Sequence, residues 1–294
     1  MGVEFITMII ISIFLGVVGF VLMPFEVHAW SLETHIKIGV DILSNISYSL
    51  IKQYPVYFLL GNIFPDFFTI FKNVSNFKKN LSTHSWDTVS MLFKNAEDGD
   101  DLSFAHGYAA HLSADIIAHN YFVPQNYLLI SKRKFVSHFM MEAADKHFKD
   151  VSYYLTLIYL LDFAEENSDL FLRTFNIEKT YFLKQLRYLK LSLKYQHILK
   201  LQHIARKIDR MIIPEFINRC RAYRAKAYEV AYDAVDSGFS KYMNYDPTGR
   251  ERMLKAKNNR KKMIKDIGAL NLRRAAGSKT FVRNYSPDNM ELRR

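Results

Sequence analysis

The 294-residue chain is predicted to fold as an all-α domain, a bundle-like arrangement of many helices. It contains only 11 glycines and 7 prolines, which disfavours a β-rich fold with many tight turns. Apolar residues recur at three- and four-residue intervals across residues 151–243, as they do in amphipathic helices. The chain is 49% hydrophobic and 15% aromatic, which is enough to build a sizeable core.

The N-terminal 29 residues are predicted to be a signal peptide or a membrane anchor. Residues 5–23 are uncharged and mostly apolar. Val27 and Ala29 are small residues at the positions that signal peptidase recognises, so cleavage would fall before Trp30. An uncleaved anchor is the alternative, because the apolar run can span a bilayer and is preceded by Glu4 without any Lys or Arg. Both readings predict an extracytoplasmic location, either secreted, periplasmic or anchored.

Three candidate site residues lie in the segments that follow. Thr34 is a plausible N-cap of a helix, and His35 would sit in its first turn. Pro65 favours a turn, and it places Asp66 in the strongly apolar stretch 59–68. A carboxylate there is expected to be a metal ligand or general base, or else the cap of a following helix. His84 lies in a polar loop.

The chain is organised around residues 104–122. His111, Asp115 and His119 are spaced four residues apart, so a helix carries all three on one face. The residues between them are small or apolar, which predicts burial and disfavours the alternative of a solvated face. A buried carboxylate needs a partner charge or a metal ion, and one metal-ligating face satisfies all three residues.

The composition limits which ligands are available. A single cysteine, Cys220, excludes an internal disulfide and a zinc site built on several thiolates, whereas ten histidines favour a His and carboxylate ligand set. A further helix predicted over residues 132–149 carries His138 and Glu142 at i, i+4. That pair is a second candidate ligand face, with an ordinary surface pair as the alternative.

The net charge of +11 is concentrated at the C-terminus. Residues 244–294 carry 14 Lys and Arg against 5 Asp and Glu, so the rest of the chain, residues 1–243, is nearly neutral. This distribution argues mildly against a basic surface outside the tail that could bind the phosphates of a nucleic acid. This tail, residues 244–294, is predicted to be partly disordered, with a basic helix over residues 250–274. The tail as a whole is expected to bind anionic membranes and to be dispensable for catalysis. A solvated tail is the alternative.

Taken together, these motifs resemble the zinc-dependent phospholipase C family. The resemblance covers about residues 30–145 and rests on the order of the candidate ligands along the chain. That order is Trp30, His35, Pro65-Asp66, His84, His111-x3-Asp115-x3-His119 and His138-x3-Glu142.

The resemblance implies an all-α fold with a buried His, Asp and Glu site for two or three zinc ions. Trp30 would bind zinc through its own amine and carbonyl, together with His35 and a bridging Asp115. A second ion would be held by Asp66, His84, His111 and Asp115. A third would be held by His119, His138 and Glu142.

The implied activity is phosphodiester hydrolysis at phospholipid headgroups through a zinc-activated water, with Asp66 as the catalytic carboxylate. A membrane surface is the expected partner. A zinc-dependent single-strand nuclease of the same fold is one alternative, with nucleic acid as the less favoured substrate. A non-enzymatic membrane-associated protein that retains the fold is the other.

Overall fold

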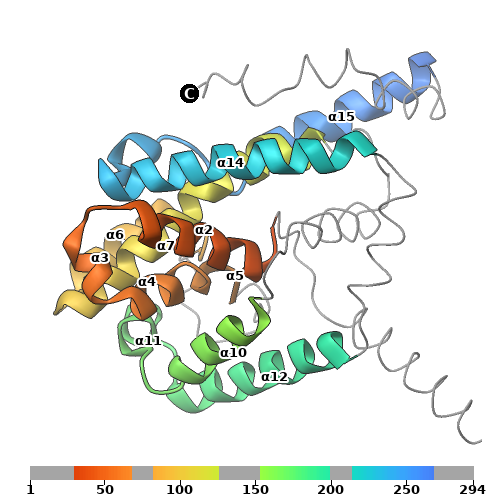
Figure 1. Ribbon diagram of the computed structural model, residues 1–294. Coiled ribbons are helices and arrows are strands. Elements are labelled where there is room, and N and C mark those ends of the chain that lie inside the picture. Colours follow the sequence, from red (N-terminus) through yellow and green to blue (C-terminus); the bar gives the residue numbers. More distant parts are fainter. Residues whose placement is uncertain (1–29, 68–81, 126–152, 199–213, 268–294) are drawn as a thin grey trace, which may run out of the picture.

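The computed structural model describes residues 30–67, 82–125, 153–198 and 214–267 (Figure 1). Within these ranges every regular element is a helix, which confirms the predicted all-α fold. The first elements are α2 (Leu32–Asn45), α3 (Ser49–Gln53), α4 (Pro55–Gly61), α5 (Phe64–Phe67), α6 (Trp86–Asn95), α7 (Gly99–Ile117) and the π-helix η2 (Ala118–Phe122). The later ones are α10 (Tyr154–Phe163), α11 (Asp169–Phe175), α12 (Lys179–Ile198), α14 (Pro214–Asp236), the 3₁₀-helix η4 (Phe239–Tyr242) and α15 (Arg250–Ile267).

Helix α7 is the central element of the fold. The Asp98 side chain caps it by accepting a hydrogen bond from the Asp101 backbone N–H at 3.1 Å. Asp100 and Asp101 in the first turn also complement the positive end of the helix dipole. From Phe104 onward, nearly all of its residues are buried, because α4, α6 and α14 pack around it. The small residues along α7 allow this close approach.

Two glycines bring the backbones of α4 and α7 into direct contact. A Cβ atom at Gly61 would lie 2.0 Å from the carbonyl oxygen of Phe104, and a Cβ at Gly107 would lie 2.0 Å from that of Phe58. Neither position therefore accepts a larger residue without moving a helix. The contact sets α5, which follows α4 after two residues, beside α7.

A buried aromatic cluster anchors α5. The Phe64 ring lies 5.0 Å from that of Phe104 and 4.7 Å from that of Phe171, while Phe67 lies 5.6 Å from Phe182. The turn predicted at Pro65 is wrong, since Pro65 lies inside α5. A proline is tolerated there because N–H groups in the first turn of a helix have no intrahelical partner. The apolar neighbours of Asp66 thus fix the position of its carboxylate.

The outer helices lie on opposite sides of this centre. Figure 1 shows α14 and α15 along one side, and α10 and α12 along the other. No helix within the described ranges is both long and apolar enough to cross a membrane. The segment predicted as a signal peptide or anchor, residues 1–29, lies outside those ranges.

Candidate metal centre

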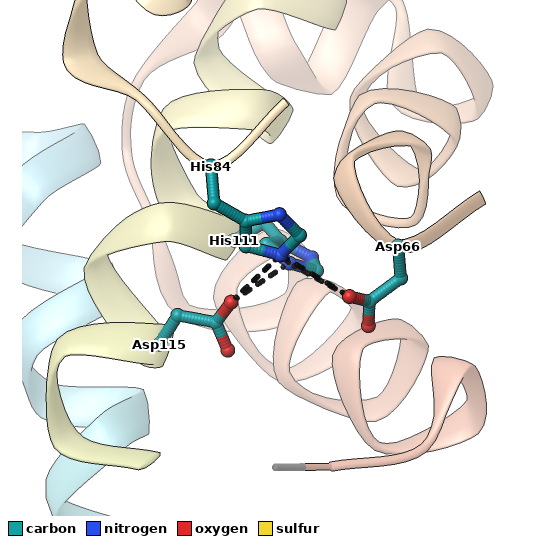
Figure 2. Close-up of side chains that lie close together, drawn as sticks. All are labelled: Asp66, His84, His111 and Asp115. Atoms are coloured by element: carbon teal, nitrogen blue, oxygen red, sulfur yellow. Dashed lines mark hydrogen bonds and ion pairs between the residues drawn. The ribbon is translucent and has the colours of Figure 1, made fainter. Parts of the chain in front are cut away.

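Four side chains from three parts of the chain converge on one buried point (Figure 2). Asp66 comes from α5, His84 from the loop before α6, and His111 and Asp115 from successive turns of α7. Their potential ligand atoms all lie within 4.8 Å of one another. His84 is half-buried, and the other three are buried.

The spacing of these atoms suits a single zinc ion. His84 Nε2 lies 3.2 Å from both Asp66 Oδ1 and Asp115 Oδ2, and 3.4 Å from His111 Nε2. His111 Nε2 lies 3.1 Å from Asp115 Oδ2 and 3.8 Å from Asp66 Oδ1. Ligands at about 2.0–2.1 Å from a tetrahedral zinc ion are about 3.3 Å apart. The four residues therefore form a donor set of the right size and chemistry.

His35 and His119 border this set on either side of Asp115. His35 Nε2 lies 3.6 Å from Asp115 Oδ1, and its ring stacks on that of His111 with centroids 3.8 Å apart. His119 Nε2 lies 3.7 Å from Asp115 Oδ2. Both oxygens of Asp115 thus face imidazole nitrogens, which is the arrangement that a bridging carboxylate requires.

The helix that carries these ligands changes its winding at the site. α7 is regular through Ile117 and then opens into η2, so His119 lies in a π-helical turn. The sequence pattern predicted one regular helix across this stretch. π-helical turns are rare and occur frequently at functional sites.

Outer contacts orient the imidazoles. His111 Nδ1 lies 2.9 Å from the Asn62 carbonyl oxygen, and donation of Nδ1–H to that oxygen leaves the Nε2 lone pair facing the cluster. The Asn62 side chain donates to the His35 carbonyl oxygen at 3.0 Å. His84 Nδ1 lies 3.1 Å from Thr83 Oγ1, and the Tyr108 hydroxyl donates to the Thr83 carbonyl oxygen at 2.6 Å.

Sequence reasoning missed Asn62, Thr83 and Tyr108 as supports of the site. The available signal for Asn62 was a lone amide inside the apolar stretch 59–68. Thr83 and Tyr108 showed no such signal, because their roles depend on a contact between a loop and a distant helix.

The electrostatics show that the cluster suits a cation. Burial alone lowers the pKa of His84, but hydrogen bonds to Asp115 and Asp66, together with their charges, outweigh burial and raise it to about 10. The Asp115 carboxyl is held well below its usual pKa range, because His111 and His119 outweigh the effect of its burial. Without a metal, an imidazolium at His84 therefore takes the place of the cation.

Buried polar atoms that lack hydrogen-bond partners among the described residues also indicate a cation site. Burial and the nearby His111 lower the pKa of His35 to about 3, so its ring is neutral. Neither of its ring nitrogens has a hydrogen-bond partner among the described residues. Asp115 Oδ2 lies 3.1–3.7 Å from the Nε2 atoms of three imidazoles, so several positively polarised or cationic partners compete for one oxygen. A metal ion would satisfy these atoms.

The structure thus brings together six of the predicted site residues, namely Asp66, His84, His111 and Asp115 at the centre, with His35 and His119 beside them. The predicted ligand Trp30 is buried, with its ring 6.0 Å from that of Phe122 at the end of η2. The predicted ligands His138 and Glu142 lie outside the described residues. All nine ligand assignments stay predictions.

Comparison with known proteins identifies one family. The family model described as zinc dependent phospholipase C matches residues 34–198. That range is more than half of the chain, and it contains the four central residues of the cluster. No curated protein and no solved structure matches the chain.

Proposed function

The chain belongs to the zinc-dependent phospholipase C family, and from this premise we propose that it is a zinc-dependent hydrolase acting on phosphodiester bonds of phospholipid headgroups. The observation that carries the proposal is the convergence of Asp66, His84, His111 and Asp115 on one buried point. Two carboxylates and two imidazoles at tetrahedral spacing form a zinc-binding donor set. The family match favours a phosphodiester substrate over other zinc chemistry.

We assign the metal ligands as follows. Asp66, His84, His111 and Asp115 would hold one zinc ion, because their ligand atoms face a common point. Asp115 would also serve a second ion, together with His35 and the N-terminal amine and carbonyl of Trp30. A third ion would use His119, His138 and Glu142. When bound, zinc neutralises phosphate oxygens and lowers the pKa of a water molecule, which is the chemistry that phosphodiester hydrolysis needs.

The protein side chains supply position and proton transfer. Asp66 Oδ1 faces His84 and His111, while its Oδ2 lies 3.8 Å from His35 Nε2. One oxygen can thus serve the central ion while the other orients the attacking water or accepts its proton. Asn62 keeps the His111 ring in the tautomer that presents Nε2 to the cluster.

Hydrolysis assays on defined substrates test the proposed activity. The zinc-loaded protein is expected to release phosphorylated headgroups from phosphatidylcholine or phosphatidylethanolamine vesicles, and to lose this activity with a chelator. Single-stranded DNA is the matched negative substrate. Preferential cleavage of the DNA would identify the protein as a nuclease and not as a phospholipase C. Inactivity of the zinc-loaded protein on every substrate would contradict the assignment as an enzyme.

The membrane surface is the proposed partner. Helix α15 exposes Lys255, Lys257, Lys261, Lys262 and Lys265, beside Leu254, which is 59% exposed. Basic residues near an anionic surface contribute about 1 kcal/mol each. Co-sedimentation with anionic vesicles at low salt is expected to weaken when these five lysines are replaced by glutamine. Equal sedimentation of both forms would exclude α15 as a membrane element.

Zinc binding is expected to depend on pH through His84. With its pKa near 10, metal-free His84 carries a proton at pH 7, and it must lose that proton to bind zinc. His35, with a pKa near 3, is already neutral and releases none. Zinc affinity should therefore rise about tenfold per pH unit between pH 7 and 9. Calorimetry in two buffers of different ionisation enthalpy should detect release of at least one proton, and none released would contradict the assignment.

The mature chain is expected to begin at Trp30. A peptide nitrogen is a poor zinc ligand, whereas the amine created by cleavage after Ala29 is a good one. The buried position of Trp30 against Phe122 supports an anchored new N-terminus. We therefore propose export and processing, which places the protein outside the cytoplasm. Intact mass of the protein from its native host tests this, and a mature chain beginning at Met1 or Gly2 would remove the Trp30 ligand.

A further inference from the structure

A short loop near the C-terminus contacts two of the elements that carry the metal cluster. This C-terminal loop, residues 245–249, joins η4 to α15 and lies beyond the residues that match the family. The Trp86 Nε1–H donates to the carbonyl oxygen of Tyr245 at 2.9 Å. The Asn120 side chain donates to the carbonyl oxygen of Asp246 at 2.7 Å. Trp86 follows His84 by two residues, and Asn120 directly follows His119.

The closest approach is between Gly249 and His119. A Cβ atom at Gly249 would lie 2.1 Å from the carbonyl oxygen of His119, 2.5 Å from its carbonyl carbon and 2.8 Å from its Cβ. Gly249 also has a φ of +58°, a conformation that favours glycine. The backbone of the C-terminal loop therefore rests directly on the backbone of His119, and only glycine permits this contact.

The C-terminal loop is itself fixed. The Asp246 carboxylate accepts hydrogen bonds from the Thr248 backbone N–H at 2.8 Å and from the Arg250 backbone N–H at 3.2 Å. These bonds cap α15, which packs against η2 and places the Arg252 guanidinium 6.0 Å from the centre of the Tyr121 ring. Pro247 and Gly249 are buried in the contact. The loop can therefore act as a rigid support.

We infer that the C-terminal loop is a positioning element of the metal centre, holding the π-helical turn so that His119 faces Asp115. A π-helix is a rare conformation, and the Gly249 contact and the Asn120 hydrogen bond both act on this turn. The inference rests on the proposed role of His119 as a ligand. It also opposes the sequence-based expectation that everything after residue 243 is dispensable, since the loop belongs to that tail.

The test compares two glycine substitutions by metal titration. Gly249→Ala adds a methyl group against His119, whereas Gly238→Ala adds one at another positive φ, +94°, where no atom of the described part of the chain lies within 4 Å. Both changes place alanine at a positive φ, and the strain is the larger at Gly238, where ψ is 142°. Only the Gly249 change adds a contact with His119. Co²⁺ is titrated into each full-length variant, into wild type and into His119→Ala, and its visible absorption is followed.

We expect His119→Ala and Gly249→Ala to lose the same metal equivalent, or to bind it at least tenfold more weakly, with the same spectral change. Gly238→Ala should titrate like wild type. If Gly249→Ala does not fold, Trp86→Phe should weaken the same equivalent, because it removes the hydrogen bond to Tyr245 while keeping an aromatic ring against Phe239. The inference would be overturned by any of three results. Gly249→Ala and Gly238→Ala could bind Co²⁺ equally well, Trp86→Phe could leave Co²⁺ binding unweakened, or His119→Ala could bind Co²⁺ like wild type. The readout is binding, so an absence of hydrolytic activity would contradict the proposed function alone.

Discussion

Replacing Asp115 by asparagine is expected to abolish hydrolysis and to lower zinc affinity by more than the 10- to 100-fold typical of outer-shell changes. The carboxylate is about 1% exposed, and its two oxygens lie 3.1–3.7 Å from the Nε2 atoms of four histidines. Asparagine keeps the shape of the side chain but removes the charge, and it offers one oxygen where aspartate offers two. It can therefore neither neutralise a cation nor bridge two ions.

His106→Gln is the matched control on the same helix. His106 lies five residues before His111, and its ring contacts those of Tyr48 and Phe93, at centroid distances of 5.2 and 4.9 Å. Burial lowers its pKa to about 4, so the substitution exchanges one neutral side chain for another at pH 7. Elemental analysis and kcat/KM should change in the Asp115 variant and hardly in the His106 variant. Equal zinc loss in both would show that the ligand face of α7 is assigned wrongly.

Removing zinc is expected to lower the melting temperature by about 10 °C and to abolish activity. Zinc at 1,000 times its dissociation constant stabilises a folded protein by about 4 kcal/mol, and each kcal/mol corresponds to about 2–4 °C in a domain of this size. The reason lies in the cluster: both nitrogens of His35 are buried without a hydrogen bond to any residue in the described ranges, and the carboxylates of Asp66 and Asp115 lie on either side of His84.

Thermal melts with and without a chelator measure this effect. Adding back zinc should restore the transition, whereas magnesium should not, because imidazole-rich sites disfavour hard cations. The metal-free form should also lose stability as the pH rises from about 6.5 towards 10, since the raised pKa of His84 stabilises the folded state only while that residue is protonated. Unchanged melting of a preparation shown to be zinc-free would refute the prediction.

The sequence by itself determined the helical class and the ligand chemistry. Helical periodicity and the scarcity of glycine and proline predicted the all-α fold, which the structure confirms. The spacing of His111, Asp115 and His119 places them on one face because a helix repeats its side-chain direction about every four residues. The single cysteine restricted the ligands to histidine and carboxylate. All of these features are local or compositional, so they can be read without knowing the fold.

Only the tertiary structure decided how the remaining parts of the site meet. Asp66 reaches α7 because Gly61 and Gly107 let two backbones touch, and because Phe64 and Phe67 pack on distant rings. The Asn62 carbonyl oxygen contacts the His111 ring, which is 49 residues away in the sequence. The Asp246 carbonyl oxygen accepts a hydrogen bond from Asn120, which is 126 residues away. The π-helical turn that contains His119 likewise could not be predicted from the sequence. Such contacts depend on how side chains from distant segments pack together, and no local period in the sequence encodes that packing.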